Sequence, residues 1–285
     1  MRSYPRPVAR WSGGPDRGAG GDPLRLRMLL RAFNPSPWTG PTGNNTYLLD
    51  GTIPTLIDAG VGHPDHLAAI AAALGGRPLA QVLLTHKHTD HVTGVPALAA
   101  RWPELRVRSL DAATGAGPDL LNDGQYVHAG DTVVRVLATP GHAPDHACFV
   151  SGDDVYTGDL IRTGGTIVIA ASRGGDLRAY LDSLRRVRAL GAKRLLPGHG
   201  PAIEDPEDAI DRYLAHRESR ERQVLQTLAE GHPTAEAIAL QIYRGLDPAL
   251  TAAASDTILA HLIKLENDGR VTRRGDRWGL RLEGS

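Results

Sequence analysis

Hydrophobic residues follow two different periods along this chain, one typical of strands and one typical of helices. Leu24, Leu26 and Met28 alternate with arginines, which is the period of two expected for a half-buried strand. Residues 176–190 place apolar side chains three or four positions apart, which predicts an amphipathic helix. Shorter apolar runs predict strands at residues 46–49, 55–57, 82–84, 133–138, 147–150, 155–156 and 194–196, and helices at residues 65–74 and 95–100. Strands and helices therefore alternate, and this order indicates two sheets sandwiched between helices.

The C-terminal part of the chain has a separate pattern of helices and a hairpin. Helices are predicted for residues 209–228, 234–243 and 249–267, and a short hairpin around Gly275 follows them. Three helices followed by a hairpin are typical of a winged-helix domain. The hairpin region carries a cluster of arginines: Arg270, Arg273, Arg274, Arg277 and Arg281. Two interpretations stay open, because such arginines could contact phosphates or could form a solvated or docking face.

Composition limits the classes of protein to which this chain can belong. The chain has 285 residues, with 32 lysines and arginines against 32 aspartates and glutamates, so no overall field attracts nucleic acid. Cys148 is the single cysteine, which excludes an internal disulfide and is compatible with a reducing compartment. There is no run of about 18 apolar residues and no signal peptide. We therefore expect a cytoplasmic protein without a membrane partner, and the sequence leaves its oligomeric state open.

The strongest chemical signal is the segment Thr85–His91. Three histidines and Asp90 fall within it, directly after a predicted buried strand, so their side chains are delivered to one end of that strand. His86 and His88 are two residues apart, and on extended backbone their rings point to the same side, where they can share one cation. Asp90 and His91 follow where the chain must turn, and they can face a second cation. The segment therefore predicts a metal site at a strand end.

Other residues of the kinds that bind metals follow later strands, each beside a glycine-bearing turn. His142 and His146 follow one predicted strand, Asp159 follows the next hairpin, and His199 follows the last strand. Each alone is weak evidence, because a histidine in a turn is more often a surface or capping residue. Their order after the cluster strengthens the prediction, because one site can be assembled from turns that are distant in sequence.

In this order the motif residues resemble those of the metallo-β-lactamase superfamily. The resemblance implies an αβ/βα sandwich of the α/β class with a dinuclear site at its rim, usually zinc, although Mn²⁺ or Fe²⁺ also suits nitrogen and oxygen ligands. It implies a ligand set, namely His86, His88 and His146 for the first metal, Asp90, His91 and His199 for the second, and Asp159 as the bridge. His142 precedes a ligand in the motif and is carried over only as a neighbour. The classical secreted lactamases with a cysteine ligand place it at the bridging position, so Asp159 is a departure from them.

Further motifs narrow the resemblance. The segments Asn34–Trp38, Gly43–Tyr47 and Pro197–Pro201, together with the C-terminal tail, are similar to the β-lactamase-like endoribonuclease family, in which a winged helix follows the catalytic domain. The likeness covers about residues 24–281. It implies three segments, namely a mobile N-terminal arm at residues 1–23, a metallo-β-lactamase-fold catalytic domain at residues 24–205, and a helical linker with a winged helix at residues 206–285.

A dinuclear site implies hydrolysis, because two cations that share a water lower its pKa from about 15.7 to near 7 and so supply hydroxide. With the family role carried over, Asp90 would orient this hydroxide and pass a proton to the leaving group. The resemblance favours cleavage of single-stranded RNA. The alternatives are a glyoxalase II-like thioester or ester hydrolase with weak β-lactamase activity, and a non-catalytic nucleic-acid-binding protein. Substrate contacts are expected at Asn45, Thr46, Ser172 and Arg173.

Overall fold

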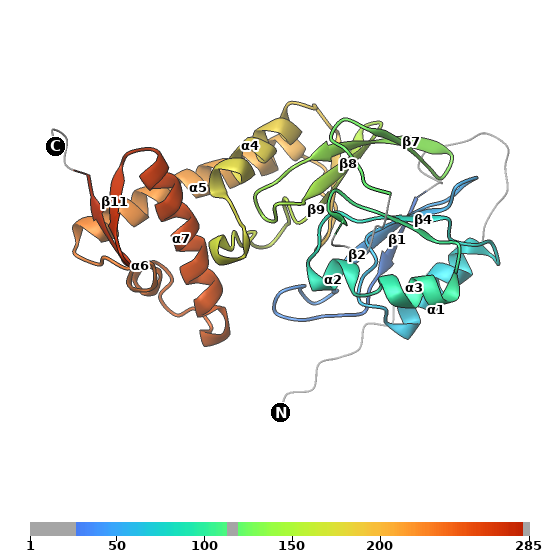
Figure 1. The fold of residues 1–285 in the computed structure, drawn as a ribbon, viewed down its shortest axis with the longest axis horizontal. Coiled ribbons are helices and arrows are strands. Elements are labelled where there is room, and N and C mark those ends of the chain that lie inside the picture. Colours follow the sequence, from blue (N-terminus) through green and yellow to red (C-terminus); the bar gives the residue numbers. More distant parts are fainter. Residues whose placement is uncertain (1–26, 113–118, 282–285) are drawn as a thin grey trace.

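Two five-stranded sheets pack face to face in the computed structural model, with helices on their outer faces and a helical part at the C-terminal end (Figure 1). The structure describes residues 27–112 and 119–281. The predicted arm at residues 1–23 and most of the first predicted strand lie outside the described residues. Among the helices of the described ranges, none is both long and apolar enough to cross a membrane. The expected α/β sandwich is therefore confirmed, together with the winged helix described below.

The first sheet has the strand order β1-β2-β3-β4-β5. Its strands are β1 (Arg27–Arg31), β2 (Asn45–Leu49), β3 (Thr55–Ile57), β4 (Gln81–Leu83) and β5 (Arg106–Arg108). On its outer face, Leu56 shares a buried cluster with Ile70 of α1 (Pro64–Leu74) and Leu98 of α3 (Val95–Arg101). Because β3 and β4 are parallel, both strands end at the same edge of the sheet, and the segments that follow them lie side by side.

The second sheet has the order β10-β9-β8-β7-β6, in which β10 and β9 are parallel. Its strands are β6 (Tyr126–Ala129), β7 (Thr132–Ala138), β8 (Ala147–Ser151), β9 (Asp154–Gly158) and β10 (Arg194–Pro197). A core between the two sheets contains Tyr47 and Leu83 from the first sheet and Phe149 and Tyr156 from the second. The rings of Tyr47 and Tyr156 meet edge to face with centroids 5.2 Å apart, a favourable geometry for two aromatic rings.

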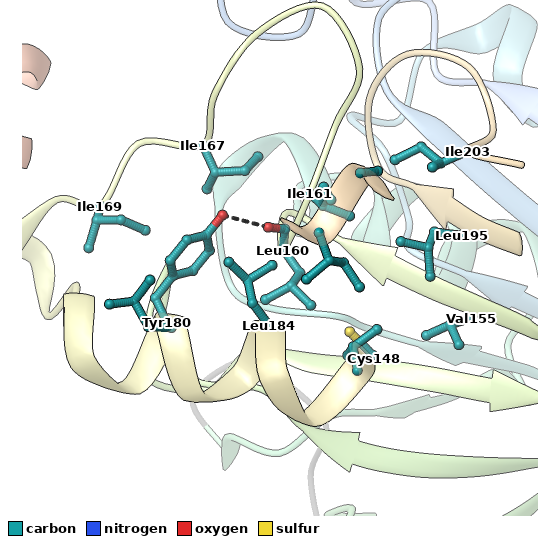
Figure 2. Close-up of a cluster of buried hydrophobic side chains, with 14 of the residues drawn as sticks. Cys148, Val155, Leu160, Ile161, Ile167, Ile169, Tyr180, Leu184, Leu195 and Ile203 are labelled. Atoms are coloured by element: carbon teal, nitrogen blue, oxygen red, sulfur yellow. Dashed lines mark hydrogen bonds between the residues drawn. The ribbon is translucent and has the colours of Figure 1, made fainter. Parts of the chain in front are cut away.

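Helix α4 (Leu177–Arg188) covers the outer face of the second sheet and packs on the cluster of apolar side chains shown in Figure 2. Tyr180 lies within this cluster and is fully buried, and its hydroxyl donates a hydrogen bond of 2.8 Å to the backbone carbonyl of Leu160 (Figure 2). Leu160 directly follows Asp159 in the chain. The packing of α4 therefore fixes the backbone that carries a predicted site residue.

The C-terminal part is a winged helix with its own core. It contains α5 (Pro206–Ala229), α6 (Ala235–Ile242), a 3₁₀ turn η4 (Pro248–Leu250), α7 (Thr251–Asn267), β11 (Val271–Arg274) and β12 (Arg277–Leu280). Figure 1 shows α5 running from the sandwich to the winged helix. Its first turns join the core under α4 through Ile210, and its last turns join the winged-helix core through Val224. The predicted boundary at residues 205 and 206 therefore falls at the start of a helix that both cores share, and that boundary remains a prediction.

Polar contacts fix the winged helix on the sandwich. The Ser172 hydroxyl of the 3₁₀ turn η3 (Ala171–Arg173) donates to Asp256 of α7 at 2.6 Å, and the Ser172 backbone amide donates to the same carboxylate at 2.9 Å. Arg178 of α4 pairs with Asp268, which follows α7. The buried Arg217 of α5 lies over the ring of Tyr180 and donates to the Ile167 carbonyl. The winged helix is therefore docked on the sandwich through contacts that involve none of the hairpin arginines, whose role stays open.

The structure corrects several predicted strands. Of the strand expected from Leu24 to Met28, the described residues belong to β1, which continues to Arg31. The sequence pattern missed β5 and β6, which are the last strands of the two sheets. Both carry polar side chains, with one exposed residue in β5 and alternate exposed residues in β6. Edge strands have one neighbour and are often polar, so their hydrophobic period is weak.

We predict that Tyr180→Phe lowers the free energy of unfolding by about 1 to 3 kcal/mol, because it leaves the buried Leu160 carbonyl without its donor. The measurement is urea unfolding followed by circular dichroism. Tyr126→Phe is the matched control, since the Tyr126 side chain is 69% exposed and its hydroxyl is solvated. Equal stability of Tyr180→Phe and Tyr126→Phe would contradict the role assigned to this hydrogen bond.

Candidate metal centre

Histidine and aspartate side chains converge in two neighbouring groups at the rim of the sandwich. The first group consists of His86, His88, His142 and Asp159, and the second group consists of Asp90, His91 and His199. Within each group, one potential ligand atom of every residue lies within 4.8 Å of the others. The residues come from the turns after β4, β7, β9 and β10 and from the short helix α2 (Thr89–Val92). Residues that are distant in sequence therefore lie close together, at the ends of the strands that they follow.

Three nitrogen atoms of the first group face one another. The His88 Nδ1 atom lies 2.9 Å from His86 Nε2 and 2.8 Å from His142 Nε2. His142 Nδ1 donates to the Val168 carbonyl at 2.8 Å, and His86 Nδ1 lies 3.0 Å from the Thr85 hydroxyl oxygen. The free lone pairs of His86 and His142 therefore point at His88. A proton on His88 could satisfy only one of these contacts, whereas a cation satisfies all three nitrogens, so the first group fits a metal ion.

The histidines of the first group are neutral, and this protonation state also suits a metal ion. Burial, with the neighbouring histidines, lowers the pKa of His86 well below its usual value and that of His88 to about 4. Burial lowers the pKa of His142 as well. Neutral imidazoles are the form that binds metals, because the ligand nitrogen needs a free lone pair.

The second group is built around Asp58, whose carboxylate orients His91. Asp58 accepts hydrogen bonds from the Thr85 backbone amide at 2.8 Å and from its hydroxyl, while the Asp58 Oδ2 atom lies 2.7 Å from His91 Nδ1. His91 Nδ1 therefore carries a proton, and its Nε2 atom faces Asp90 Oδ2 and Asp159 Oδ1, each at 3.5 Å. Burial alone would lower the pKa of His91, but the carboxylates of Asp58, Asp159 and Asp90 raise it well above its usual value. A cation at this place would take over the positive charge that the carboxylates stabilise.

Asp159 lies between the two groups and offers one oxygen to each. Its Oδ2 atom is 3.5 Å from His142 Nε2, and its Oδ1 atom is 3.1 Å from His199 Nε2. Asp159 is 8% exposed, and Oδ1 has no hydrogen-bond partner in the part of the chain that the structure describes. Burial would raise the pKa of this carboxyl, but His199 and His91 hold it well below its usual range, so it is ionised. A buried carboxylate with an oxygen toward each group fits a bridge between two cations.

The first group contains His142, which sequence analysis expected only as a neighbour, and the assignment of His146 as a ligand stays a prediction. Sequence analysis expected His146 as the ligand and His142 as a neighbour, but the grouped residue is His142. The Nε2 atom of His146 accepts a hydrogen bond from the Asp159 backbone amide at 3.1 Å, and its Nδ1 atom lies 2.8 Å from the Thr139 hydroxyl. Both nitrogens of His146 therefore have a polar partner within the protein, and Nε2 lies beside Asp159. His146 therefore supports the backbone of Asp159.

Two of the four predicted substrate contacts are structural residues. The Asn45 amide donates to the carbonyls of Pro197 and Gly200, both at 2.8 Å, and the Thr46 hydroxyl lies 2.8 Å from His66. Asn45 is 1% exposed and Thr46 is fully buried, so neither can touch a substrate.

The residue that reaches the metal groups is Asn44, which sequence analysis missed. Its amide nitrogen donates to Asp90 Oδ2 at 2.9 Å and lies 3.3 Å from His91 Nε2. Asn34, on the loop before β2, donates in turn to the Asn44 side-chain oxygen at 2.7 Å. The signal in the sequence was the pair Asn44-Asn45, but neighbouring residues on extended backbone point to opposite sides, and sequence alone did not decide between them.

A large groove, about 1930 Å³ in volume, connects the metal groups with the winged helix. Its floor includes Asp90 and Asp159, and the predicted contacts Ser172 and Arg173 lie along it. The loop at residues 34–39 forms another part of its wall. The winged helix contributes a largely apolar wall that includes Tyr243, Leu246, Pro248, Leu250, Leu259 and Trp278. The groove is therefore built by both parts of the chain, and a long ligand in it would contact both.

Comparison with known proteins identifies the family. A model of the metallo-beta-lactamase superfamily matches residues 39–199, which is more than half of the chain and contains all seven grouped residues. The chain belongs to the metallo-beta-lactamase superfamily. A model of the beta-lactamase associated winged helix domain matches residues 234–278. The superfamily domain and the winged helix that the sequence predicted are both confirmed.

Two fungal relatives represent the matches in sequence. The lactamase-like protein nscB of Arthroderma gypseum is 36% identical over 80% of this chain and 78% of its own length. The atrochrysone carboxyl ACP thioesterase of Aspergillus fumigatus is 37% identical over 65% of this chain and 60% of its own length. Neither name describes a nuclease, so these relatives do not support the resemblance to endoribonucleases.

Two solved structures show how far the fold extends. A beta-lactamase domain protein from Burkholderia ambifaria matches with a TM-score of 0.80 and 24% identity, covering 90% of this chain and 92% of that chain. The protein TTHA1623, in a di-iron-bound form, matches with a TM-score of 0.51 and 32% identity, covering 61% of this chain and 95% of that chain. The first likeness shows the fold alone. The second belongs to a protein that holds iron, so the fold does not restrict the metal to zinc.

We predict that His142→Ala lowers the metal content from two ions per chain toward one, because it removes a nitrogen of the first group. His146→Ala is the matched comparison, and we expect it to keep two ions while lowering the free energy of unfolding, since it breaks the bond to the Asp159 amide. The measurement is elemental analysis after equilibration with Zn²⁺ and gel filtration. Loss of an ion in His146→Ala but not in His142→Ala would restore the ligand set expected from the sequence.

We predict that Asp58→Asn weakens metal binding by about 10- to 100-fold. An amide nitrogen facing His91 Nδ1 would move the ring proton to Nε2, where it blocks the lone pair that faces the second group. Competition with a fluorescent zinc chelator measures the affinity. Asp65→Asn is the control, because the side chain of Asp65 is 71% exposed on α1. Wild-type affinity in Asp58→Asn would show that this carboxylate does not orient the ligand.

Proposed function

We propose that this chain is a metal-dependent thioesterase, which holds the thioester carbonyl at the two metal groups and the acyl chain along the groove. The observation that carries the proposal is the continuity of the groove, since the same cavity touches Asp90 and Asp159 at one end and apolar winged-helix residues at the other. The Aspergillus fumigatus relative supports it, because that protein is named a thioesterase. The hydrolase chemistry of the superfamily suits both substrates that the sequence analysis considered, namely single-stranded RNA and a thioester.

The groups fit a pair of divalent ions, held by the first and second groups with Asp159 between them. When bound, such a pair polarises a carbonyl and lowers the pKa of a water from about 15.7 to near 7. Asp90 lies on the groove floor with Oδ2 fixed by Asn44, where a carboxylate can accept a proton from the attacking water. Burial opposes ionisation of Asp90, but His91 and His199 hold the pKa of its carboxyl below its usual range, so it is present as the base.

A thioester suits this arrangement of charged groups. A thiol has an unperturbed pKa of about 8.5, so the sulfur leaves readily without a strong acid beside it. Beside the metal groups the groove is lined by the carboxylates of Asp90 and Asp159, both ionised, whereas its other acidic lining residues, Glu236, Asp256 and Asp276, belong to the winged helix. The chain therefore supplies a base and a positive field more readily than an acid. Such a site favours substrates whose leaving group, like a thiol, departs without protonation by a strong acid.

The groove walls suit an apolar acyl chain. Trp38, on the loop beside the metal groups, is 49% exposed, and its backbone carbonyl is held by Arg162 at 2.8 Å. On the opposite side, Leu250, Leu259 and Trp278 of the winged helix line the same groove. Burial of apolar surface stabilises a complex by about 25 cal/mol per Å² before the cost of ordering, so a long acyl chain gains from both walls.

Cleavage of single-stranded RNA, which the sequence favoured, is the second reaction of this centre to be tested. A phosphodiester could also be polarised by two cations. The cations along the groove are Lys87, Arg162, Arg173 and Arg273, of which Lys87 is paired with Asp111. Neither fungal relative is named as a nuclease. We therefore place RNA cleavage below thioester hydrolysis.

The metal is proposed to be zinc, with iron or manganese as the other ions that a mixed nitrogen and oxygen site accepts. The di-iron-bound TTHA1623 supports including iron. Elemental analysis of protein purified without chelators and without added metal identifies the ion.

The deciding experiment compares octanoyl and acetyl thioesters of N-acetylcysteamine with a fluorogenic single-stranded RNA. We expect metal-dependent release of thiol, loss of the activity with chelator, and its return with Zn²⁺, Mn²⁺ or Fe²⁺. Binding of RNA with neither thioester hydrolysis nor RNA cleavage, in protein shown to hold metal, would favour the non-catalytic alternative. RNA cleavage without thioester hydrolysis would replace the proposal by the endoribonuclease.

We predict that Ala253→Trp lowers kcat/KM for the octanoyl thioester by about tenfold while the acetyl thioester changes little, because the indole fills part of the apolar wall. Ala100→Trp, at an exposed position of α3, is the matched control. Steady-state kinetics for both chain lengths check the result. An equal loss for acetyl and octanoyl substrates would place the acyl chain outside this part of the groove.

A further inference from the structure

The outward face of the winged-helix hairpin consists of two pairs of arginines with a pair of small residues between them. In the register of β11 and β12, Arg274 lies opposite Arg277, and Thr272 lies opposite Gly279. The Arg281 amide donates to the Arg270 carbonyl at 3.0 Å, which continues the same pairing by one residue. Opposite residues of an antiparallel pair share one face, and residues two apart do as well. We call the resulting surface the four-arginine face, formed by Arg270, Arg274, Arg277 and Arg281.

The other face of the hairpin accounts for its packing. Val271 is 2% exposed and Trp278 is 5% exposed, and both belong to the winged-helix core. Arg273 shares this inner face and places its guanidinium over the Trp278 ring, at 5.2 Å from the ring centroid. The hairpin is therefore held by its inner face, and its fold does not depend on arginines on the outer one.

The four-arginine face is an unfavourable arrangement for the isolated chain. All four arginines are exposed, and within the described residues none of them forms an ion pair. The nearby carboxylate of Asp268 is already occupied by Arg178 and Lys264. Like charges directly opposite in a sheet are destabilising. The chain has no net charge, so this concentration of positive charge is local and would be relieved by an anionic partner.

The position of the hairpin relates this face to the substrate groove. Arg273, Asp276 and Trp278 of the same hairpin line the groove. A macromolecule that rests on the four-arginine face would therefore contact the hairpin whose opposite face lines the groove. Thr272 and Gly279 at the centre leave room for close approach, since a Cβ built on Gly279 meets no atom within 4 Å.

We propose that the four-arginine face docks an acidic acyl carrier protein, which delivers its thioester-linked acyl chain into the groove. This inference rests on the proposed thioesterase function. Guanidinium groups bind carboxylates with two parallel hydrogen bonds, and four of them match a surface rich in aspartate and glutamate. A single-stranded nucleic acid is the less suitable partner, because its binding usually needs aromatic side chains for base stacking, and the described residues of this face include none.

The experiment compares two substrates that carry the same acyl group. One is octanoyl acyl carrier protein, and the other is the octanoyl thioester of N-acetylcysteamine. For Arg274→Glu with Arg277→Glu, we expect KM for the carrier-bound substrate to rise by about tenfold or more, while kcat/KM for the small thioester stays at the wild-type value. The wild-type KM for the carrier-bound substrate should also rise with salt, since exposed charges are screened. Unchanged turnover of the small thioester shows that the double variant is folded.

A matched double reversal, Arg101→Glu with Arg185→Glu, makes the same change in net charge on α3 and α4 and should leave both substrates unaffected. Equal KM values for the double variant and the wild type with the carrier-bound substrate would overturn the docking proposal. So would a tenfold loss of binding to fluorescent single-stranded RNA in the same variant without an effect on the carrier. Failure of the wild type to hydrolyse the small thioester would refute the proposed function separately, and anisotropy with labelled carrier protein would then still test the docking.

Discussion

Hydrogen bonds to the far nitrogens of three buried imidazoles determine where the candidate metal centre lies. Thr85, Asp58 and Val168 occupy the Nδ1 atoms of His86, His91 and His142, so each Nε2 lone pair points into its group. Asp58 provides this support from a strained backbone, with φ at 61°, a region that non-glycine residues seldom adopt. Its carboxylate accepts bonds from Thr85 and His91 that hold it there. The parallel pairing of β3 and β4 brings Asp58 and Thr85 together, so the centre depends on the register of two short strands.

The sequence predicted the parts of this centre whose signals are local. The cluster at Thr85–His91 follows a buried strand directly, and the structure places its three histidines and Asp90 as expected. The choice between His142 and His146 could not be made in this way. Both lie in one turn and have different partners, since the Asp159 amide contacts His146 Nε2 and the Val168 carbonyl accepts from His142 Nδ1. Those partners come from elsewhere in the fold, so no motif contains the information.

The winged helix is a part of the site as well as a neighbouring domain. Helix α5 belongs to both cores, and its Arg217 is 1% exposed, with its guanidinium held by the Thr166 hydroxyl, the Ile167 carbonyl and the Tyr180 ring instead of a carboxylate. Burying a cation is costly unless its hydrogen bonds are satisfied, so this contact commits α5 to one position on the sandwich. Ile167 lines the groove, and the same arginine therefore fixes part of the groove wall. The sequence showed the three helices and the hairpin, but their docking depends on contacts between distant residues.

This division of roles explains how one centre can serve different reactions in a superfamily. The metal groups provide a field and a place for water, and those properties do not distinguish a thioester from a phosphodiester. Discrimination must come from groups that contact the rest of the substrate, because only differences in binding separate two substrates of one site. Under the proposed function those groups are the residues that line the groove, namely the loop at residues 34–39 and the apolar residues of the winged helix, including Leu250 and Trp278. The proposed function therefore assigns substrate preference to that loop and the winged helix instead of the metal groups, and exchange of the winged helix should alter the substrate more than the metal requirement.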